Sequence, residues 1–192
     1  MALTSLSPGP QFQLSFRDLP FRATRCWSTM PGHIMTDGAS AEARDVATRF
    51  YERFQARDGA GMAALYSDAA TFSDPAFPDL KGEQVGRMWR MLTSRGRDLE
   101  LTFEPPVAEG PWQRVAWTAR YTFSATGKKV VNHVVGRLRI EGGRIVEHRD
   151  EFDFAAWAAQ AFGLVGRLLG GAGFFQRFVQ GKGAKALADY TK

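Results

Sequence analysis

The chain has 192 residues, of which 44% are hydrophobic and 12% aromatic, which suits one globular domain with additions. Its only cysteine, Cys26, excludes an intramolecular disulfide framework, and no segment matches a secretory signal or a membrane-spanning run of about twenty apolar residues. The net charge is +5, but residues 39–154 sum to zero and residues 155–192 carry +4, a poor footprint for nucleic acid. We therefore expect a soluble cytoplasmic protein that does not bind nucleic acid.

Residues 1–38 contain four prolines and no apolar periodicity. This composition predicts a disordered or loosely attached N-terminal extension. The three arginines of the segment are also compatible with a weak transit-like signal: Arg17, Arg22 and Arg25. Alternatively, the natural start is Met30 or Met35, the second of which lies just before the first predicted helix.

Three helices are predicted before the strands that begin at residue 99. The first spans residues 40–57, with Ser40 as its N-cap and one buried stripe formed by Val46, Phe50 and Phe54. A short second helix carries Met62, Leu65 and Tyr66 and ends at residues 67–68. Gly82 opens the third helix, whose core side presents Val85, Met88, Trp89 and Leu92.

Between the second and third helices, a short strand over residues 70–73 is broken by Asp74 and Pro75. Proline donates no N–H and disfavours the α region for the preceding residue, so the strand ends there. Phe72, Phe77 and Trp89 supply apolar walls around the carboxylate. Desolvation raises a carboxyl pKa and makes Asp74 a candidate general base near neutral pH. The alternative is that Asp74 only caps the loop, since Asp-Pro commonly initiates turns.

The chain from residue 99 to residue 153 is predicted to form strands. The expected strands span residues 99–107, 114–124, 129–141 and 144–153, with tight turns at 125–127 and 142–143. Short turns predict an antiparallel meander. Together with three N-terminal helices, this meander gives an α+β fold over residues 39–155. A strongly bent sheet covered by helices leaves a conical cavity at its open end.

Residues 156–192 are predicted to form a C-terminal helical tail. A first stripe with helical spacing comprises Trp157, Ala161, Leu164 and Leu168, and a second helix follows the Gly170–Gly171 break. The tail is interpreted as a lid or flank packed on the domain or on a dimer partner. The competing interpretation is an amphipathic segment that lies on anionic lipid, because its aromatic residues accompany Arg167, Arg177, Lys182 and Lys185.

The order of elements over residues 40–155 resembles the NTF2-like superfamily, in particular its SnoaL-like and ketosteroid-isomerase-like branch. The resemblance is carried by RFYERFQARDGAGMAALYSDAATFSDP and by GGRIVEHRDEFDF. It implies a cone of curved, mainly antiparallel sheet, a pocket for a small apolar molecule, no cofactor and a homodimer.

In the isomerases the Asp of the Asp-Pro pair is the general base, so the resemblance assigns that role to Asp74. A tyrosine and a protonated aspartic acid act there as oxyanion donors. The corresponding positions here fall on Phe50, with Tyr51 on a different helical face, and on Gly136. One such donor is worth roughly 3–4 kcal/mol of transition-state stabilisation, so ordinary ketosteroid isomerase activity is not expected.

Strand periodicity places Val146, His148, Asp150 and Phe152 on one face of the last strand. The resemblance implies that this face lines the pocket, as do Asn132, Val134, Gly136 and Leu138 of the preceding strand. In epoxide-hydrolase-like members, the last-strand Asp of an Arg-Asp pair activates water, and Asp150 matches that position. The partner Arg and Asp of those enzymes are replaced by Val134 and Gly136.

The predicted catalytic residues are therefore Asp74 as base, with His148 and Asp150 as an acid/base pair. The predicted ligand-binding residues are Phe50, Phe72, Trp89, Asn132, Val134 and Phe152. No metal site is expected, because the three histidines lack ligand spacing. The site suits cofactor-free proton transfer or hydration and hydrolysis. The alternatives are a non-catalytic ligand-binding or dimeric scaffold protein, and a peripheral membrane protein that uses its basic aromatic tail.

Overall fold

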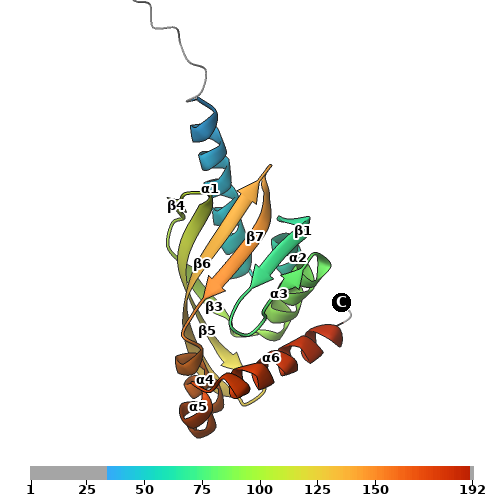
Figure 1. The fold of residues 1–192 in the computed structure, drawn as a ribbon, viewed down its shortest axis with the longest axis vertical. Coiled ribbons are helices and arrows are strands. Elements are labelled where there is room, and N and C mark those ends of the chain that lie inside the picture. Colours follow the sequence, from blue (N-terminus) through green and yellow to red (C-terminus); the bar gives the residue numbers. More distant parts are fainter. Residues whose placement is uncertain (1–33, 191–192) are drawn as a thin grey trace, which may run out of the picture. The chain divides into compact units, whose positions relative to one another are not determined.

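The computed structural model describes residues 34–190, so the predictions for residues 1–33 lie outside the described residues. The elements follow the order α1 (Ile34–Gln55), α2 (Gly59–Ala63), β1 (Tyr66–Ser73), β2 (Leu80–Lys81), α3 (Glu83–Arg95), β3 (Glu100–Phe103), β4 (Val107–Glu109), β5 (Trp112–Phe123), β6 (Lys128–Glu141), β7 (Arg144–Glu151), α4 (Phe154–Phe162), α5 (Leu164–Leu169) and α6 (Gly173–Ala188) (Figure 1). This is the α+β class that the sequence predicts.

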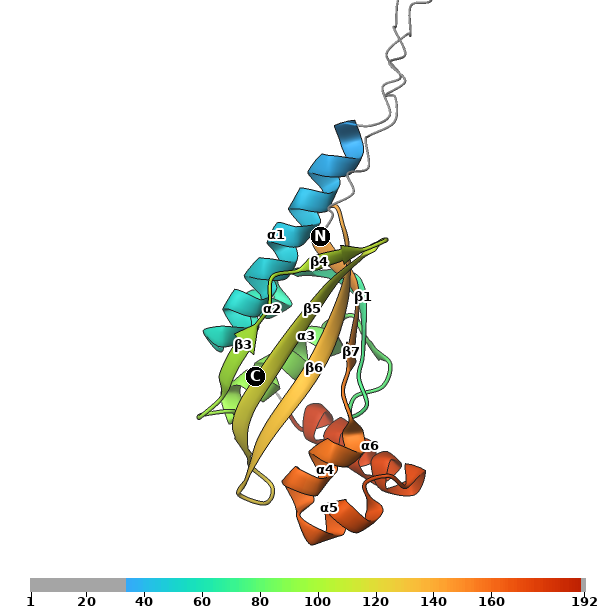
Figure 2. The same ribbon diagram turned by 90° about the vertical axis from the view of Figure 1, so that its left-hand side faces the viewer.

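The sheet is curled but not closed, and most of its strand pairs are antiparallel (Figure 2). The strand order is β2-β1-β7-β6-β5-β3, with β4 paired to β5. The predicted meander of β5, β6 and β7 is confirmed. The parallel pairing of β1 with β7, which aligns Phe72 with His148, was not predicted. It places the end of β1, and with it Asp74, beside the last strand.

The core lies between the sheet and helices α1 and α3. Phe50 and Tyr51 of α1 are fully buried, and Trp89 of α3 and Phe72 of β1 are nearly so. The predicted stripe on the first helix is confirmed, since Val46, Phe50 and Phe54 all belong to this core. Burial of one such side chain contributes about 1.5–3 kcal/mol, so the aromatic cluster fixes both helices on the sheet.

Several predicted boundaries differ from the structure, and the predicted strand over residues 99–107 is divided into β3 and β4. Helix α1 begins at Ile34, so Ser40 lies inside the helix and is not its N-cap. Extension of a helix costs little once its packed turns are formed. Tyr66 begins β1 instead of ending α2, and it is buried on the same strand face as Ala70 and Phe72. The predicted opening of the third helix at Gly82 is confirmed.

A β-bulge at Val146 interrupts the pairing of β6 with β7. Arg139 pairs with Glu147 and Ile140 with Ile145, so Val146 has no partner residue. The two-residue period is broken there, and Ile145 is buried in place of Val146. The prediction that Val146 faces inward was therefore wrong.

The C-terminal helices begin at Asp153, whose side chain accepts a hydrogen bond of 3.0 Å from the backbone N–H of Ala156. The predicted continuous stripe is wrong, because α4 ends at Gly163, whose φ of +63° favours glycine. Trp157 is buried, whereas Leu164 and Leu168 of α5 are 72% and 74% exposed.

Across the described part of the chain, no helix combines the length and apolar character needed to cross a bilayer.

The packing of α2 on α3 is expected to depend on Gly59. A Cβ at this position would lie 2.3 Å from Oγ1 of Thr93 and 2.8 Å from Cα of Arg90. Gly59→Ala should lower the free energy of unfolding by about 1–3 kcal/mol, measured by urea denaturation. The control, Gly181→Ala, adds a Cβ with no atom within 4 Å in helix α6 and should raise it by up to about 1 kcal/mol. Equal effects of the two substitutions would contradict the close packing.

Candidate active site

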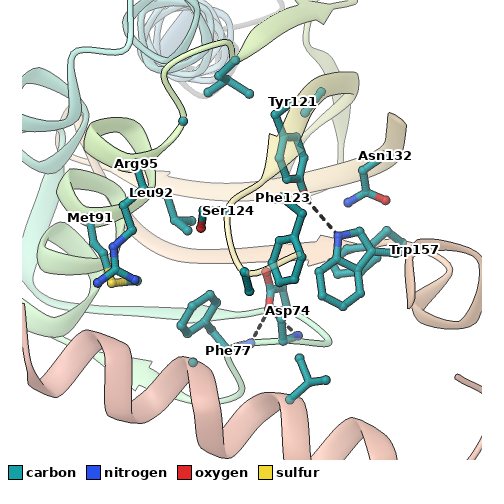
Figure 3. A pocket seen from close by; sticks show the side chains of 18 of the residues that line it. Asp74, Phe77, Met91, Leu92, Arg95, Tyr121, Phe123, Ser124, Asn132 and Trp157 are labelled. Atoms are coloured by element: carbon teal, nitrogen blue, oxygen red, sulfur yellow. Dashed lines mark hydrogen bonds between the residues drawn. The ribbon is translucent and has the colours of Figure 1, made fainter. Parts of the chain in front are cut away.

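A largely apolar pocket of about 630 Å³ lies at the end of the sheet nearest the C-terminal helices (Figure 3). Strand β5 provides one wall with alternate side chains, Trp117, Ala119, Tyr121 and Phe123. The other walls come from α3, the loop after β1, β6, β7, α4 and α6. This volume suits a small organic molecule, and such pockets usually contain a few polar groups that orient the ligand.

Asp74 is one of these polar groups, on the loop that follows β1 (Figure 3). Its Oδ1 accepts hydrogen bonds from the backbone N–H groups of Ala76, at 2.7 Å, and Phe77. None of the hydrogen bonds found within residues 34–190 uses its Oδ2. Asp74 thus caps the loop, as one interpretation of the sequence proposed, and still contributes to the pocket wall.

The environment of Asp74 changes its acidity. Burial is the largest cause and raises the pKa of Asp74 to about 7, although the N–H of Phe77 works in the opposite direction. The negative charge of Asp150 raises this pKa further. At neutral pH both the carboxylate and the carboxylic acid are therefore populated, which is the condition for a general acid/base group.

Asp150, the second carboxylate on the pocket wall, is held by a buried chain of hydrogen bonds. Trp89 Nε1–H donates to Oη of Tyr66 at 2.9 Å, which leaves the Tyr66 hydroxyl proton for Nδ1 of His148 at 2.6 Å. With Nδ1 as the acceptor, Nε2–H of His148 donates to Oδ1 of Asp150 at 3.0 Å. The chain orients Asp150 while both nitrogens of His148 are occupied.

The structure brings six of the nine predicted site residues to the pocket wall: Asp74, Trp89, Asn132, Val134, Asp150 and Phe152. The other three, Phe50, Phe72 and His148, do not line the pocket and are almost fully buried. The rings of Phe50 and Phe72 each pack edge-on against His148 at 5.2 Å between centroids. His148 is only 1% exposed, so it positions Asp150 instead of meeting a ligand.

Several site residues were missed at the level of sequence. Tyr66 was placed in a helix, although it shares strand parity with Ala70 and Phe72, a signal that was available. Tyr121 and Trp157 both line the pocket and are joined by a hydrogen bond of 2.9 Å from the indole N–H to the phenol oxygen (Figure 3). Their contact joins a strand to a helix 36 residues away in sequence, which no local pattern predicts.

Gly136 leaves room for a donor that the sequence did not predict. A Cβ at Gly136 would lie 2.1 Å from Oη of Tyr51 and 2.8 Å from Oδ1 of Asp150. Burial, and then the charge of Asp150, raise the pKa of Tyr51 well above its ordinary value, so its hydroxyl stays protonated. Within the described residues, Tyr51 Oη and Trp117 Nε1 have no hydrogen-bond partner.

Helix α6 contacts the loop that carries Asp74. The side-chain amides of Gln176 and Gln180, one turn apart, both donate to the carbonyl oxygen of Pro75 at 3.0 Å. Both lone pairs of that carbonyl are thereby used.

Among residues 34–190, no group of three or more His, Cys, Asp or Glu side chains is arranged to hold a metal ion.

Residues 47–148 match the model of the SnoaL-like domain. The chain belongs to this family. The resemblance proposed from the sequence is thus confirmed. No curated protein sequence resembles this SnoaL-like protein closely enough to count as a match.

Solved structures share the fold of this SnoaL-like protein. One is an LEH-like epoxide hydrolase from M. tuberculosis, with 21% identity, a TM-score of 0.54, and coverage of 67% of this chain and 96% of that one. Another is AclR, a putative hydroxylase from Streptomyces galilaeus, with 19% identity, a TM-score of 0.55, and coverage of 65% and 98%. A third is a hypothetical protein with a ketosteroid isomerase-like fold from Catenulispora acidiphila, with 14% identity, a TM-score of 0.54, and coverage of 61% and 92%. These identities establish the fold and leave the reaction to be argued from the site.

The raised pKa of Asp74 predicts a pH-dependent stability. Between its unfolded value of 3.8 and its folded value of about 7, the folded protein holds a proton that the unfolded chain has lost. The contribution of Asp74 to the free energy of unfolding should therefore fall by about 2–4 kcal/mol from pH 4 to pH 8. Asp74→Asn should remove that part of the slope in urea denaturation, while Asp79→Asn, at an exposed carboxylate of the same loop, should keep it. An unchanged slope in Asp74→Asn would contradict the assignment.

The contact between Gly136 and Tyr51 predicts a non-additive pair of substitutions. Gly136→Ala should lower the free energy of unfolding by about 1–3 kcal/mol, because the new methyl group meets the Tyr51 hydroxyl. Tyr51→Phe should be neutral or stabilising, since it removes a buried hydroxyl without a partner. The double variant should recover about half of the loss, measured by thermal and urea unfolding. Additive effects would show that the two side chains do not meet.

Proposed function

We propose that this protein binds a small, largely apolar molecule in the pocket and moves a proton on it without a cofactor. The observation that carries the proposal is one carboxyl group, Asp74, with a pKa of about 7 on the wall of an apolar pocket. The substrate class is an apolar carbonyl compound with an acidic C–H bond next to the carbonyl group. Such a bond is weakly acidic, so its cleavage needs a base that is desolvated and ionised near neutral pH.

In the proposed reaction the carboxylate of Asp74 takes the proton from the carbon next to the carbonyl group. The electron pair of the broken C–H bond moves to the carbonyl oxygen and forms an enolate. The Asp74 carboxylic acid then returns a proton to this carbon or to another carbon of the conjugated system, which regenerates the carboxylate, and it exchanges its proton with water in a fraction of turnovers. The Asn132 side-chain amide, on the same pocket wall, supplies a donor for the enolate oxygen.

Asp150 has a separate role in this proposal. It accepts a hydrogen bond from a hydroxyl or enol group of the ligand, or acts as a second acid/base group. His148 and Tyr66 are positioning residues, because they hold Asp150 and do not line the pocket.

Hydrolysis or hydration is the second candidate reaction, with Asp150 as the base that deprotonates a water molecule. Two observations favour it: Asp150 ends a fully bonded Tyr66–His148 chain, and the fold is similar to that of a protein described as an epoxide hydrolase. The two reactions depend on different carboxylates, so they can be separated. A ligand-binding or dimeric scaffold protein without catalysis is the third outcome to test.

The experiment measures exchange of the α-protons of an apolar ketone, 2-tetralone, in D₂O by ¹H NMR. The wild-type protein should accelerate exchange over buffer, with a rate that rises with pH and levels off above about pH 7, where Asp74 is ionised. Asp74→Asn keeps the size of the side chain and its acceptor oxygen but removes its basicity. It should reduce the rate by about 10²–10⁴, with little change in ketone affinity by NMR titration.

Asp79→Asn is the matched control and should exchange protons at the wild-type rate, because its side chain is exposed outside the pocket. If hydrolysis is the reaction, styrene oxide should be opened with incorporation of ¹⁸O from labelled water, and Asp150→Asn should abolish it. Ketone binding without exchange or epoxide opening in the wild-type protein would leave only the binding role.

A further inference from the structure

The exposed large apolar side chains of the described chain are concentrated on two consecutive helices. All but Val107 lie on α5 or α6: Leu164, Val165, Leu168, Leu169, Phe174 and Phe178. A turn of three residues joins the two helices, and both figures of the fold place them at the same end of the domain (Figures 1 and 2). We call these six side chains the α5–α6 surface. Exposed large apolar side chains that gather on consecutive helices are a feature of interaction sites on soluble proteins.

Helix α5 is packed with its glycines inward and its leucines outward. A Cβ at Gly166 would lie 1.8 Å from the carbonyl oxygen of Ala158, and one at Gly170 would lie 3.1 Å from Cβ of Ala158. These two glycines, one turn apart, press α5 against the backbone of α4. The close approach turns the large side chains Leu164 and Leu168 away from the protein. The exposure thus follows from the way the helix is built and not from frayed packing.

The charge around this surface has one sign. Residues 154–188 contain four basic side chains and no Asp or Glu. Arg167, Arg177 and Lys182 are exposed, and within residues 34–190 none of them forms an ion pair, whereas Lys185 pairs with Asp189 at 3.3 Å. The Lys182 ammonium lies 5.5 Å from the centroid of the Phe178 ring. Apolar side chains flanked by unpaired cations complement a layer of anionic headgroups above acyl chains.

The α5–α6 surface also reaches the pocket. Phe178 is 54% exposed and, together with Lys182, lines the pocket wall. A binding partner that covers the α5–α6 surface therefore lies next to the opening of the apolar pocket.

We propose that the α5–α6 surface docks this protein on an anionic lipid bilayer, with Leu164, Leu168, Phe174 and Phe178 in the headgroup–acyl boundary. Arg167, Arg177 and Lys182 contact the lipid phosphates. The helices lie on the membrane and do not span it, consistent with the shortness of α5. Docking brings the pocket mouth to the bilayer, from which an apolar ligand can enter. The docking itself does not depend on the proposed reaction, because lipid binding is measured without substrate.

The test is co-sedimentation of the full chain with vesicles of phosphatidylcholine and of an equimolar phosphatidylcholine–phosphatidylglycerol mixture. We expect binding to the anionic vesicles that weakens at high salt. Arg167→Gln/Arg177→Gln should weaken it about thirtyfold, since each charge near such a surface contributes about 1 kcal/mol. Leu164→Ser/Leu168→Ser should weaken it by about a hundredfold or more, from the loss of two inserted side chains.

Matched controls are Val107→Ser and Arg120→Gln, which remove an exposed apolar and an exposed basic side chain from β4 and β5. Both should bind like the wild-type protein, and all variants should keep its thermal unfolding midpoint. Three results would overturn the proposal: no vesicle binding, equal binding to both lipid compositions, or binding unaffected by both α5–α6 variants. The wild-type protein could instead self-associate without binding vesicles. If Leu164→Ser/Leu168→Ser abolished that self-association, the surface would be assigned to a second copy of the chain.

Discussion

One chain of hydrogen bonds inside the aromatic core links three elements of this structure. Trp89, Tyr66, His148 and Asp150 come from α3, β1 and β7, and they form one chain of hydrogen bonds. A buried polar group without a partner costs roughly 1–3 kcal/mol, so each link fixes the element that carries it. The parallel alignment of β1 with β7, the placement of α3 and the orientation of Asp150 are therefore linked. A shift in any one of them would leave several buried donors or acceptors unpaired.

The same constraint distinguishes the two carboxylates of the pocket. Asp150 is hydrogen-bonded to Nε2 of His148 and lies beside the hydroxyl of Tyr51, which has no hydrogen-bond partner among residues 34–190. Asp74 is bonded only through Oδ1 to backbone N–H groups, and its burial raises its pKa to about 7. Carboxyl groups with such different surroundings take different roles in acid/base chemistry. This difference supports the proton transfer proposed above, although the site lacks the isomerase donors at Phe50 and Gly136.

The C-terminal helices combine two opposite surfaces. On the inner side, Gln176 and Gln180 of α6 hold the carbonyl of Pro75, next to Asp74 in the chain. On the outer side, α5 turns Leu164 and Leu168 to solvent because its glycines occupy the contact with α4. Helix α6 thus lies between the proposed docking surface and the loop that carries the proposed base.

The sequence alone indicated most helix and strand positions, the meander and the α+β class, because these follow from short-range periodicity, and the restrictions of proline singled out Asp74. The inward-facing side of β6 followed from the resemblance to the family. Only the tertiary structure decided that Asp150 reaches the pocket while His148, two residues earlier, stays behind it. It likewise decided that Val146 is bulged out and that Tyr51 fills the space at Gly136. The reason is physical: a periodic pattern specifies the face of an element, whereas depth within the core depends on side chains from elements distant in sequence.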